Sequence, residues 1–160
     1  MNDIEPLELT VWFVAVRKLA RRSKRPCGNE LESLLRHSYH LLQLAPRQFR
    51  NMIRSELPEA AFEKLLEEAE FETAARALVG PPAILSLSRL NADLFEARVC
   101  LAAELESPVT HAAEPVAALL RAWTQCLVAL EGRTIRPQTE NLHPAPRRAR
   151  SGQHLRQTEH

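Results

Sequence analysis

Glycine is scarce in this chain, and this scarcity restricts the possible folds more than any other feature. Only four of the 160 residues are glycine. All-β proteins need glycine in many of their tight turns, and nucleotide-binding enzymes need glycine-rich loops around phosphates. Leucine, alanine, glutamate and arginine dominate instead, and all four favour helices. The composition therefore predicts an all-α fold, a single helical bundle of five to six helices.

Apolar residues recur at helical spacing in several stretches, which set the expected helices. We expect helices over residues 6–25, 30–43, 46–56, 57–82, 83–106 and 115–132. The most regular period runs from Val116 to Leu130, and Gly132 is expected to end that helix. Gly80, which two prolines follow, is expected to end the helix over 57–82.

Composition divides the chain into a folded part and a tail. Residues 1–132 carry nearly all of the apolar residues, and a chain of this length can bury a core without metals or disulfides. Residues 133–160 are poor in apolar residues and rich in Pro, Arg, Gln and His, which is typical of disordered segments. We expect a helical bundle domain over 1–132 and a basic, flexible C-terminal tail over 133–160.

The net charge of +1 conceals a strong asymmetry along the chain. Residues 1–55 hold ten Lys or Arg and five Asp or Glu, residues 56–132 hold five and thirteen, and residues 133–160 hold six and two. Basic ends favour the binding of anions. Attraction between the basic N-terminal part and the acidic middle within the fold explains this layout equally well, so both interpretations stay open.

Cysteine usage and the N-terminal residues indicate a cytoplasmic location. Cys27, Cys100 and Cys126 form an odd set without a CxxC pair, which argues against a disulfide framework and for a reducing compartment. Acidic residues precede the apolar stretch LTVWFVAV (9–16), the reverse of a secretory signal. That stretch is too short to cross a membrane, so we expect no membrane span.

No motif in the chain points to catalysis, and we expect no enzymatic activity, cofactor or small-molecule substrate. The glycines are too far apart for a phosphate loop, and the sequence contains no GxSxG, CxxC or HExxH string. Cys27, His37 and His40 are candidate metal ligands, because two histidines three residues apart on a helix can point at one ion. A fourth ligand is missing, so we expect ordinary surface histidines and no metal.

Nucleic-acid binding is the chemistry that the basic segments favour. RKLARRSKR (17–25) is mostly basic, and LAPRQFRNMIRSEL (44–57) places arginines on one face of an expected helix. The second string resembles the second recognition helix of AraC-type regulators in its Pro-Arg start and its Phe/Arg rhythm, which implies a helix-turn-helix with 30–43 as the first helix. HSYHLLQL replaces the small residue and glycine turn of that family, so we do not assign the chain to it.

We therefore expect a non-enzymatic nucleic-acid-associated protein, either a regulator or a small subunit of a nucleoprotein complex, which contacts the phosphates of DNA or RNA. The candidate contacts are Arg17, Lys18, Arg21, Arg22, Lys24, Arg25, Arg47, Arg50, Asn51 and Arg54. The alternative is a protein–protein adaptor or regulator, similar to an antiactivator or a chaperone, which binds a partner through the acidic helix at 59–72. Its candidate contacts are Glu63, Glu67 and Glu70.

Overall fold

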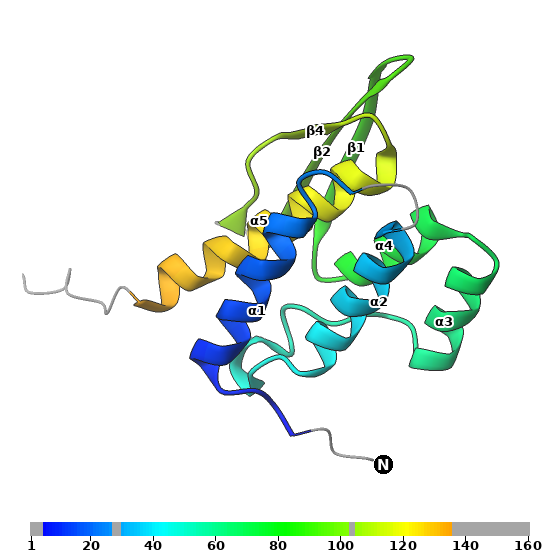
Figure 1. Cartoon of the computed structure of the whole chain (residues 1–160). Helices are drawn as coiled ribbons and strands as arrows, with labels where there is room; N and C mark the ends of the chain where they lie inside the picture. The colour runs from blue at the N-terminus through cyan, green and yellow to red at the C-terminus, as the bar shows by residue number, and fades with distance from the viewer. Residues whose placement is uncertain (1–4, 27–29, 103–104, 136–160) are drawn as a thin grey trace, which may run out of the picture.

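The computed structural model describes residues 5–26, 30–102 and 105–135 (Figure 1). Within these residues the chain forms five α-helices, a short 3-10 helix and four β-strands. The elements are α1 (Leu9–Arg22), α2 (Glu30–Gln43), η1 (Arg47–Phe49), α3 (Glu59–Glu67), α4 (Phe71–Val79), β1 (Ile84–Asn91), β2 (Leu94–Ala102), β3 (Leu105–Glu106), β4 (Thr110–Ala112) and α5 (Pro115–Ile135). The all-α helical bundle prediction is therefore wrong, because an antiparallel sheet packs against the helices in an α/β fold.

The segment 83–106, expected to be a helix, contains the β1–β2 hairpin and the short strand β3. Apolar and polar residues alternate along the hairpin strands, as in LSLS (85–88) and EARVCL (96–101), which is the two-residue period of a half-buried strand. The turn between the strands contains no glycine. Instead, the side-chain oxygen of Asn91 accepts a hydrogen bond from the backbone N–H of Asp93 at 3.0 Å, so an asparagine supplies the turn chemistry.

β2 is the central strand of the sheet. β1 lies on one side of it, and β3 and β4 pair with different halves of its other side. Alternate residues of β2 are buried on the inner face of the sheet: Ala97, Val99 and Leu101. On the outer face Arg98 forms an ion pair with Glu106 at 2.8 Å, and His111 lies 3.3 Å from Glu96. Around these side chains the outer face is polar and solvated.

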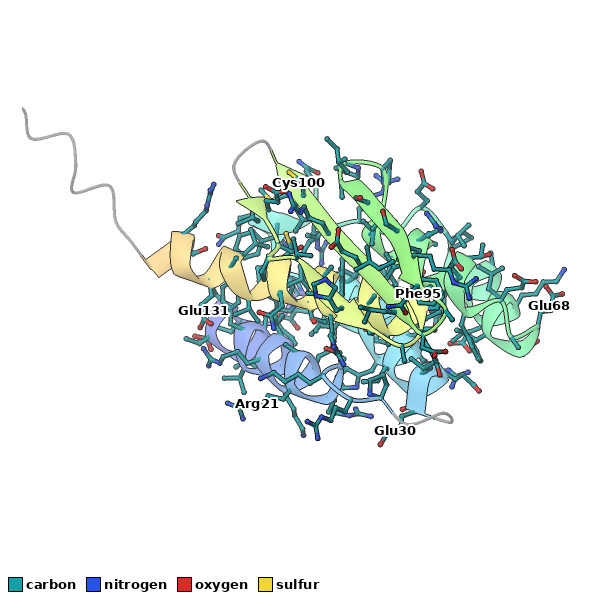
Figure 2. The ribbon with its side chains drawn as sticks, turned by 90° about the horizontal axis from the view of Figure 1, so that it is seen from above. Arg21, Glu30, Glu68, Phe95, Cys100 and Glu131 are labelled. Atoms are coloured by element: carbon teal, nitrogen blue, oxygen red, sulfur yellow. The ribbon has the colours of Figure 1, made fainter. Side chains whose placement is uncertain are left out.

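α5 is the central element of the core. It packs against the sheet and against α1 and α4, so it lies between the strands and the other helices (Figures 1 and 2). Its buried side chains are Val116, Ala117, Ala118, Leu119, Leu120, Ala122, Trp123, Thr124, Cys126, Leu127 and Leu130. The helix expected over 115–132 is confirmed, but it continues through Gly132 to Ile135. Gly132 therefore does not end it.

Aromatic side chains connect α1, α2 and α3. The first two of these helices were expected from the sequence. The ring of Phe49 lies 5.6 Å from that of Trp12 in α1, between ring centroids. The indole N–H of Trp12 donates to the carbonyl of Leu41 in α2 at 2.9 Å. Tyr39 of α2 stacks on Phe62 of α3, with their ring centroids 4.5 Å apart. α1, α2 and α3 thus share a single hydrophobic core.

The continuous helix expected over 57–82 is wrong, because two shorter helices occupy this segment. α3 ends at Glu67 and α4 begins at Phe71, and between them Ala69 has a φ of 58°. A positive φ is unfavourable for a residue with a Cβ atom. The break turns the chain so that α3 buries Phe62 and Leu66 while α4 buries its own alanines. Tertiary packing therefore overrides local helix propensity here.

The segment 46–56 does not form a recognition helix, so the helix-turn-helix prediction is wrong. Only Arg47–Phe49 is helical, as one 3-10 turn, and the rest of the segment is turn and loop. Phe49 and Ile53 are buried and anchor the segment to the core. The backbone then reaches Gly80, where an added Cβ atom would lie 2.0 Å from the carbonyl oxygen of Arg54. Only a residue without a Cβ atom fits at this close backbone contact.

Candidate nucleic-acid interface

Five exposed cations at the C-terminal end of α1 form what we call the α1 basic surface. Its members are Lys18, Arg21, Arg22, Lys24 and Arg25, and all five are exposed. Arg21 points away from α5 and the sheet (Figure 2). Among residues 5–26, 30–102 and 105–135, none of the five forms an ion pair. The positive charge of this surface is therefore not neutralised by the described part of the protein.

Contacts with α5 hold the end of α1 in place. The hydroxyl groups of Ser23 and Thr124 lie 3.1 Å apart in the core. Arg121 of α5 donates to the backbone carbonyl of Ser23 at 3.3 Å, and also to the carbonyls of Lys24 and His111. Arg121 thus satisfies carbonyls just beyond the last turn of α1, where helix ends leave acceptors without partners. The backbone that carries the α1 basic surface is fixed by these bonds.

The pKa of His37 in α2 is sensitive to the positive charge of the α1 basic surface. Partial burial lowers the pKa of His37 below its ordinary value of 6.5, and the positive charges of Arg22, Lys18 and His40 lower it further. Two members of the basic surface are therefore close enough to His37 to disfavour its protonated form. Cations at the C-terminal end of a helix also interact favourably with the helix dipole. The cations of the α1 basic surface are therefore equally typical of a solvated helix end that binds nothing.

Arg17 belongs to the same helix but has an intramolecular partner. It forms an ion pair with Glu131 near the end of α5, and Figure 2 shows Glu131 on the side of α5 that faces α1. A second ion pair joins Arg36 of α2 to Glu63 of α3 at 2.8 Å. Both pairs connect the basic N-terminal part of the chain to its acidic middle. Some basic residues of the N-terminal part are therefore neutralised by acidic residues of the same fold.

The cations of the segment 47–54 lie apart from the α1 basic surface. Phe49 packs on Trp12 in the first turn of α1, whereas the basic surface lies at the other end of that helix. Fourteen helical residues span about 20 Å at 1.5 Å per residue. Arg50 also donates to the carbonyl of Ala45 at 3.3 Å, while Arg47 and Arg54 are exposed. The structure thus does not unite the predicted phosphate contacts into one surface.

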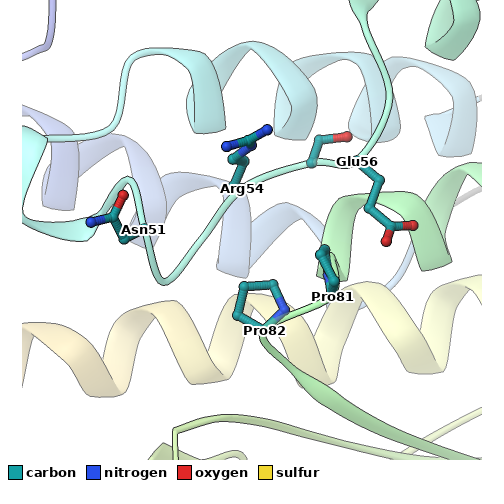
Figure 3. A pocket seen from close by; sticks show the side chains of 6 residues that line it. Asn51, Arg54, Glu56, Pro81 and Pro82 are labelled. Atoms are coloured by element: carbon teal, nitrogen blue, oxygen red, sulfur yellow. The ribbon is translucent and has the colours of Figure 1, made fainter.

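An open groove lies beside this segment, and sequence reasoning did not find it. The groove has a volume of about 490 Å³ and is lined by Asn51, Arg54, Ser55, Glu56, Pro81 and Pro82. Figure 3 shows the two prolines on the chain opposite Asn51 and Arg54. A carboxylate and a guanidinium both line the groove, so its charge favours neither an anion nor a cation. Its walls come from segments that are distant in sequence, and no local pattern connects them.

The acidic residues proposed for partner binding have different surroundings. Glu63 accepts three hydrogen bonds from Arg36, at 2.8–3.0 Å, and these bonds lower the pKa of its carboxyl group. Glu67 is exposed at the end of α3, and Glu70 is exposed at the start of α4. The break between the helices therefore separates side chains that were expected on one continuous helix.

Groups suited to metal binding or nucleophilic chemistry do not gather in the described residues. His37 and His40 are exposed on α2, and Cys27 lies outside the described residues. No three His, Cys, Asp or Glu side chains within 5–26, 30–102 and 105–135 are placed to hold a metal ion. Burial raises the pKa of Cys126 to about 11, and its thiol donates to the carbonyls of Val99 and Leu105. At neutral pH this thiol is protonated and a poor nucleophile.

Comparison with known proteins gives no match for this chain: no family model, curated protein or solved structure matches it. Among the helices that the structure describes, none is both long enough and apolar enough to cross a membrane.

Proposed function

We propose that this chain is a non-enzymatic nucleic-acid-associated protein that contacts phosphates of DNA or RNA through the α1 basic surface. The observation that carries the proposal is the exposed group of cations beside His37, without carboxylate partners among the described residues. Neutralising phosphates with such groups releases counterions and supplies affinity that is independent of sequence. The proposal includes a cytoplasmic location, on the argument from cysteine usage.

The structure changes how this binding is expected to occur. Because η1 is a single turn, a helix inserted into the major groove at 47–54 is no longer part of the proposal. The α1 basic surface is instead expected to hold the backbone of a nucleic acid without reading its bases. The adaptor alternative keeps only Glu67 and Glu70 as exposed acidic contacts, since Glu63 is paired with Arg36.

The test is binding of the purified chain to fluorescently labelled single-stranded DNA, single-stranded RNA and duplex DNA over a salt series. Five phosphate contacts give a slope of log K against log [salt] of about −3.5 for single strands and about −4.5 for duplex DNA. The variant K18E/R22E reverses the two cations that face His37 and should reduce the magnitude of this slope by about 2.

The matched control is K64E/R76E, which reverses two exposed cations on α3 and α4 and changes the net charge equally. It should bind nearly as the unchanged chain does. Equal loss in both variants would show that only the overall charge matters. No binding of any probe at low salt contradicts the proposal, and a protein partner that is lost in E67K/E70K would then favour the adaptor alternative.

A second experiment measures the pKa of His37 with and without a bound oligonucleotide. Burial lowers its pKa below 6.5 in the free protein, and the cations that face it lower the pKa further, so bound phosphates should raise the pKa by compensating the charge of these cations. NMR titration of the histidine ring protons measures this shift, and His37→Gln identifies the resonance. A His37 pKa that is the same with and without a bound oligonucleotide would place the nucleic acid away from the α1 basic surface.

A further inference from the structure

The α1 basic surface has no exposed phenylalanine, tyrosine or tryptophan ring beside it. The chain contains five phenylalanines, two tryptophans and one tyrosine, and all of them lie within the described residues. Six are buried, namely Trp12, Phe13, Tyr39, Phe49, Phe62 and Trp123, and the other two, Phe71 and Phe95, are partly buried against the core. His37 places an imidazole ring near Lys18 and Arg22, but proteins that hold single strands stack successive bases on several aromatic side chains. The surface therefore lacks a stacking platform and offers contacts to phosphates alone.

The cations of this surface are closely spaced. Lys18, Arg21 and Arg22 lie near the end of α1, and Lys24 and Arg25 follow within three residues. From Lys18 to Arg22 the helix rises about 6 Å. A duplex carries one phosphate charge per about 1.7 Å of its axis, whereas each of its strands carries one per about 3.4 Å. Over the same length a duplex therefore presents about twice as many phosphates to these cations.

Hydrogen bonds fix the backbone that carries the cations. Ser23 is buried, and its hydroxyl group donates to the carbonyl of Ala20 at 3.0 Å. The backbone N–H of Ser23 donates to the carbonyl of Leu19 at 2.9 Å, and Arg121 donates to the carbonyl of Ser23 at 3.3 Å. A preorganised surface gains most from a ligand that is also preorganised, because a flexible single strand loses conformational freedom when it binds. A duplex already holds its phosphates in fixed positions.

From these three observations we infer that the α1 basic surface binds double-stranded nucleic acid in preference to single strands. The inference rests on the proposed function and specifies its substrate. Each phosphate contact contributes about 0.9 to the salt exponent on a duplex and about 0.7 on a single strand. For five contacts the two exponents differ by about 1, so the duplex gains about tenfold in affinity over the single strand between about 1 M and about 0.1 M salt.

The experiment measures the affinity of the full chain by fluorescence anisotropy over a salt series. The probes are a labelled strand of about 20 nucleotides that cannot pair with itself, and the same strand annealed to its complement. At about 0.1 M salt the duplex should bind about tenfold more tightly than the strand, and this preference should about double each time the salt concentration is halved. Duplex RNA of the same length identifies which duplex supplies the phosphates, and the inference holds whichever of the two binds more tightly.

Two variants test whether this preference comes from the α1 basic surface. K18E/R22E leaves three of the five cations, so the gain of the duplex should fall from about tenfold to about fourfold. K64E/R76E, which reverses cations on α3 and α4, should keep the full gain. Single-strand binding that equals or exceeds duplex binding overturns the inference and leaves the proposed function standing. No binding of any probe contradicts the proposed function itself.

Discussion

Gly80 joins the helices to the sheet, and its replacement by alanine should be one of the most damaging small substitutions in this chain. Gly80 has φ 71° and ψ 168°, a backbone region that is essentially restricted to glycine. A Cβ atom there would lie 2.0 Å from the carbonyl oxygen of Arg54. That oxygen belongs to the backbone and cannot rotate away. Either the loop at 50–57 or the start of β1 must move.

The expected cost follows from these two effects. Strain in such a backbone region amounts to about 1–3 kcal/mol, and the displaced backbone adds to it, so Gly80→Ala should lower the free energy of unfolding by about 3 kcal/mol or more. For a chain of this size each kcal/mol corresponds to about 2–4 °C in Tm. Thermal unfolding followed by circular dichroism should therefore show a Tm that is about 6–12 °C lower.

Gly132→Ala is the matched control, since it is the same substitution in a different environment. Gly132 lies within α5, is exposed, and would give its Cβ atom open space. Alanine is better than glycine in a helix by about 0.5–1 kcal/mol, so the Tm should rise by about 1–4 °C. A Gly80→Ala variant with a Tm within about 2 °C of the unchanged chain would refute the reasoning from backbone geometry.

Three further predictions concern single side chains. Trp12→Phe should destabilise the protein by about 1 kcal/mol more than Trp123→Phe, because the indole N–H of Trp12 has a carbonyl partner and that of the equally buried Trp123 has none among the described residues. Chemical denaturation of both variants measures this difference. The lowered pKa of Glu63 stabilises the fold above pH 4.5, and this contribution is lost as pH falls through the folded pKa. The unchanged chain should therefore lose more stability than E63Q between about pH 5 and pH 3 in unfolding curves. With the other two cysteines replaced by serine, Cys126 should react with an aromatic disulfide reagent at pH 8 only as fast as the protein opens, because its thiol is buried with a pKa of about 11; rapid labelling of the native protein would contradict this.

Long helices with a regular apolar period could be predicted from the sequence. α1, α2 and α5 all lie within the expected segments, allowing for ends that differ by a few residues. In these helices the positions that repeat every three to four residues are also the positions that face the core. Gly80 ends α4 as expected, because its backbone conformation suits glycine.

The β-hairpin was missed because two periods compete in the same segment. Leu87, Leu90 and Leu94 fit a helical face, and this spacing favoured a helix over 83–106. The shorter alternation in LSLS (85–88) was the correct signal. The scarcity of glycine also argued against a sheet, yet Asn91 supports the turn with its side chain. The side chain of one asparagine thus supplies the turn chemistry for which glycine was expected.

The remaining differences between the expected and the observed structure come from contacts between distant segments. No local sequence pattern encodes these contacts. The chain between α2 and α3 runs as a loop that brings the Arg54 carbonyl close to Gly80. The positive φ of Ala69 is set by how α3 and α4 pack. For the candidate interface, the sequence predicts the basic residues of α1 as phosphate contacts, and the structure places Lys18, Arg21, Arg22, Lys24 and Arg25 exposed at one end of this helix. The sequence could not show that Arg17 pairs with Glu131, more than a hundred residues away.

The central position of α5 has a consequence for how the protein is made. The ribosome synthesises α1, α4 and the sheet before α5, the helix against which they pack. Until α5 emerges, the inner face of β2 and the apolar sides of α1 and α4 have no cover, and such exposed surfaces attract chaperones and other nascent chains. The contacts of α5 with α1 also span about a hundred residues of chain, which slows folding. The native core should therefore assemble late and cooperatively, and a nascent chain arrested before residue 115 should remain sensitive to proteases along its whole length.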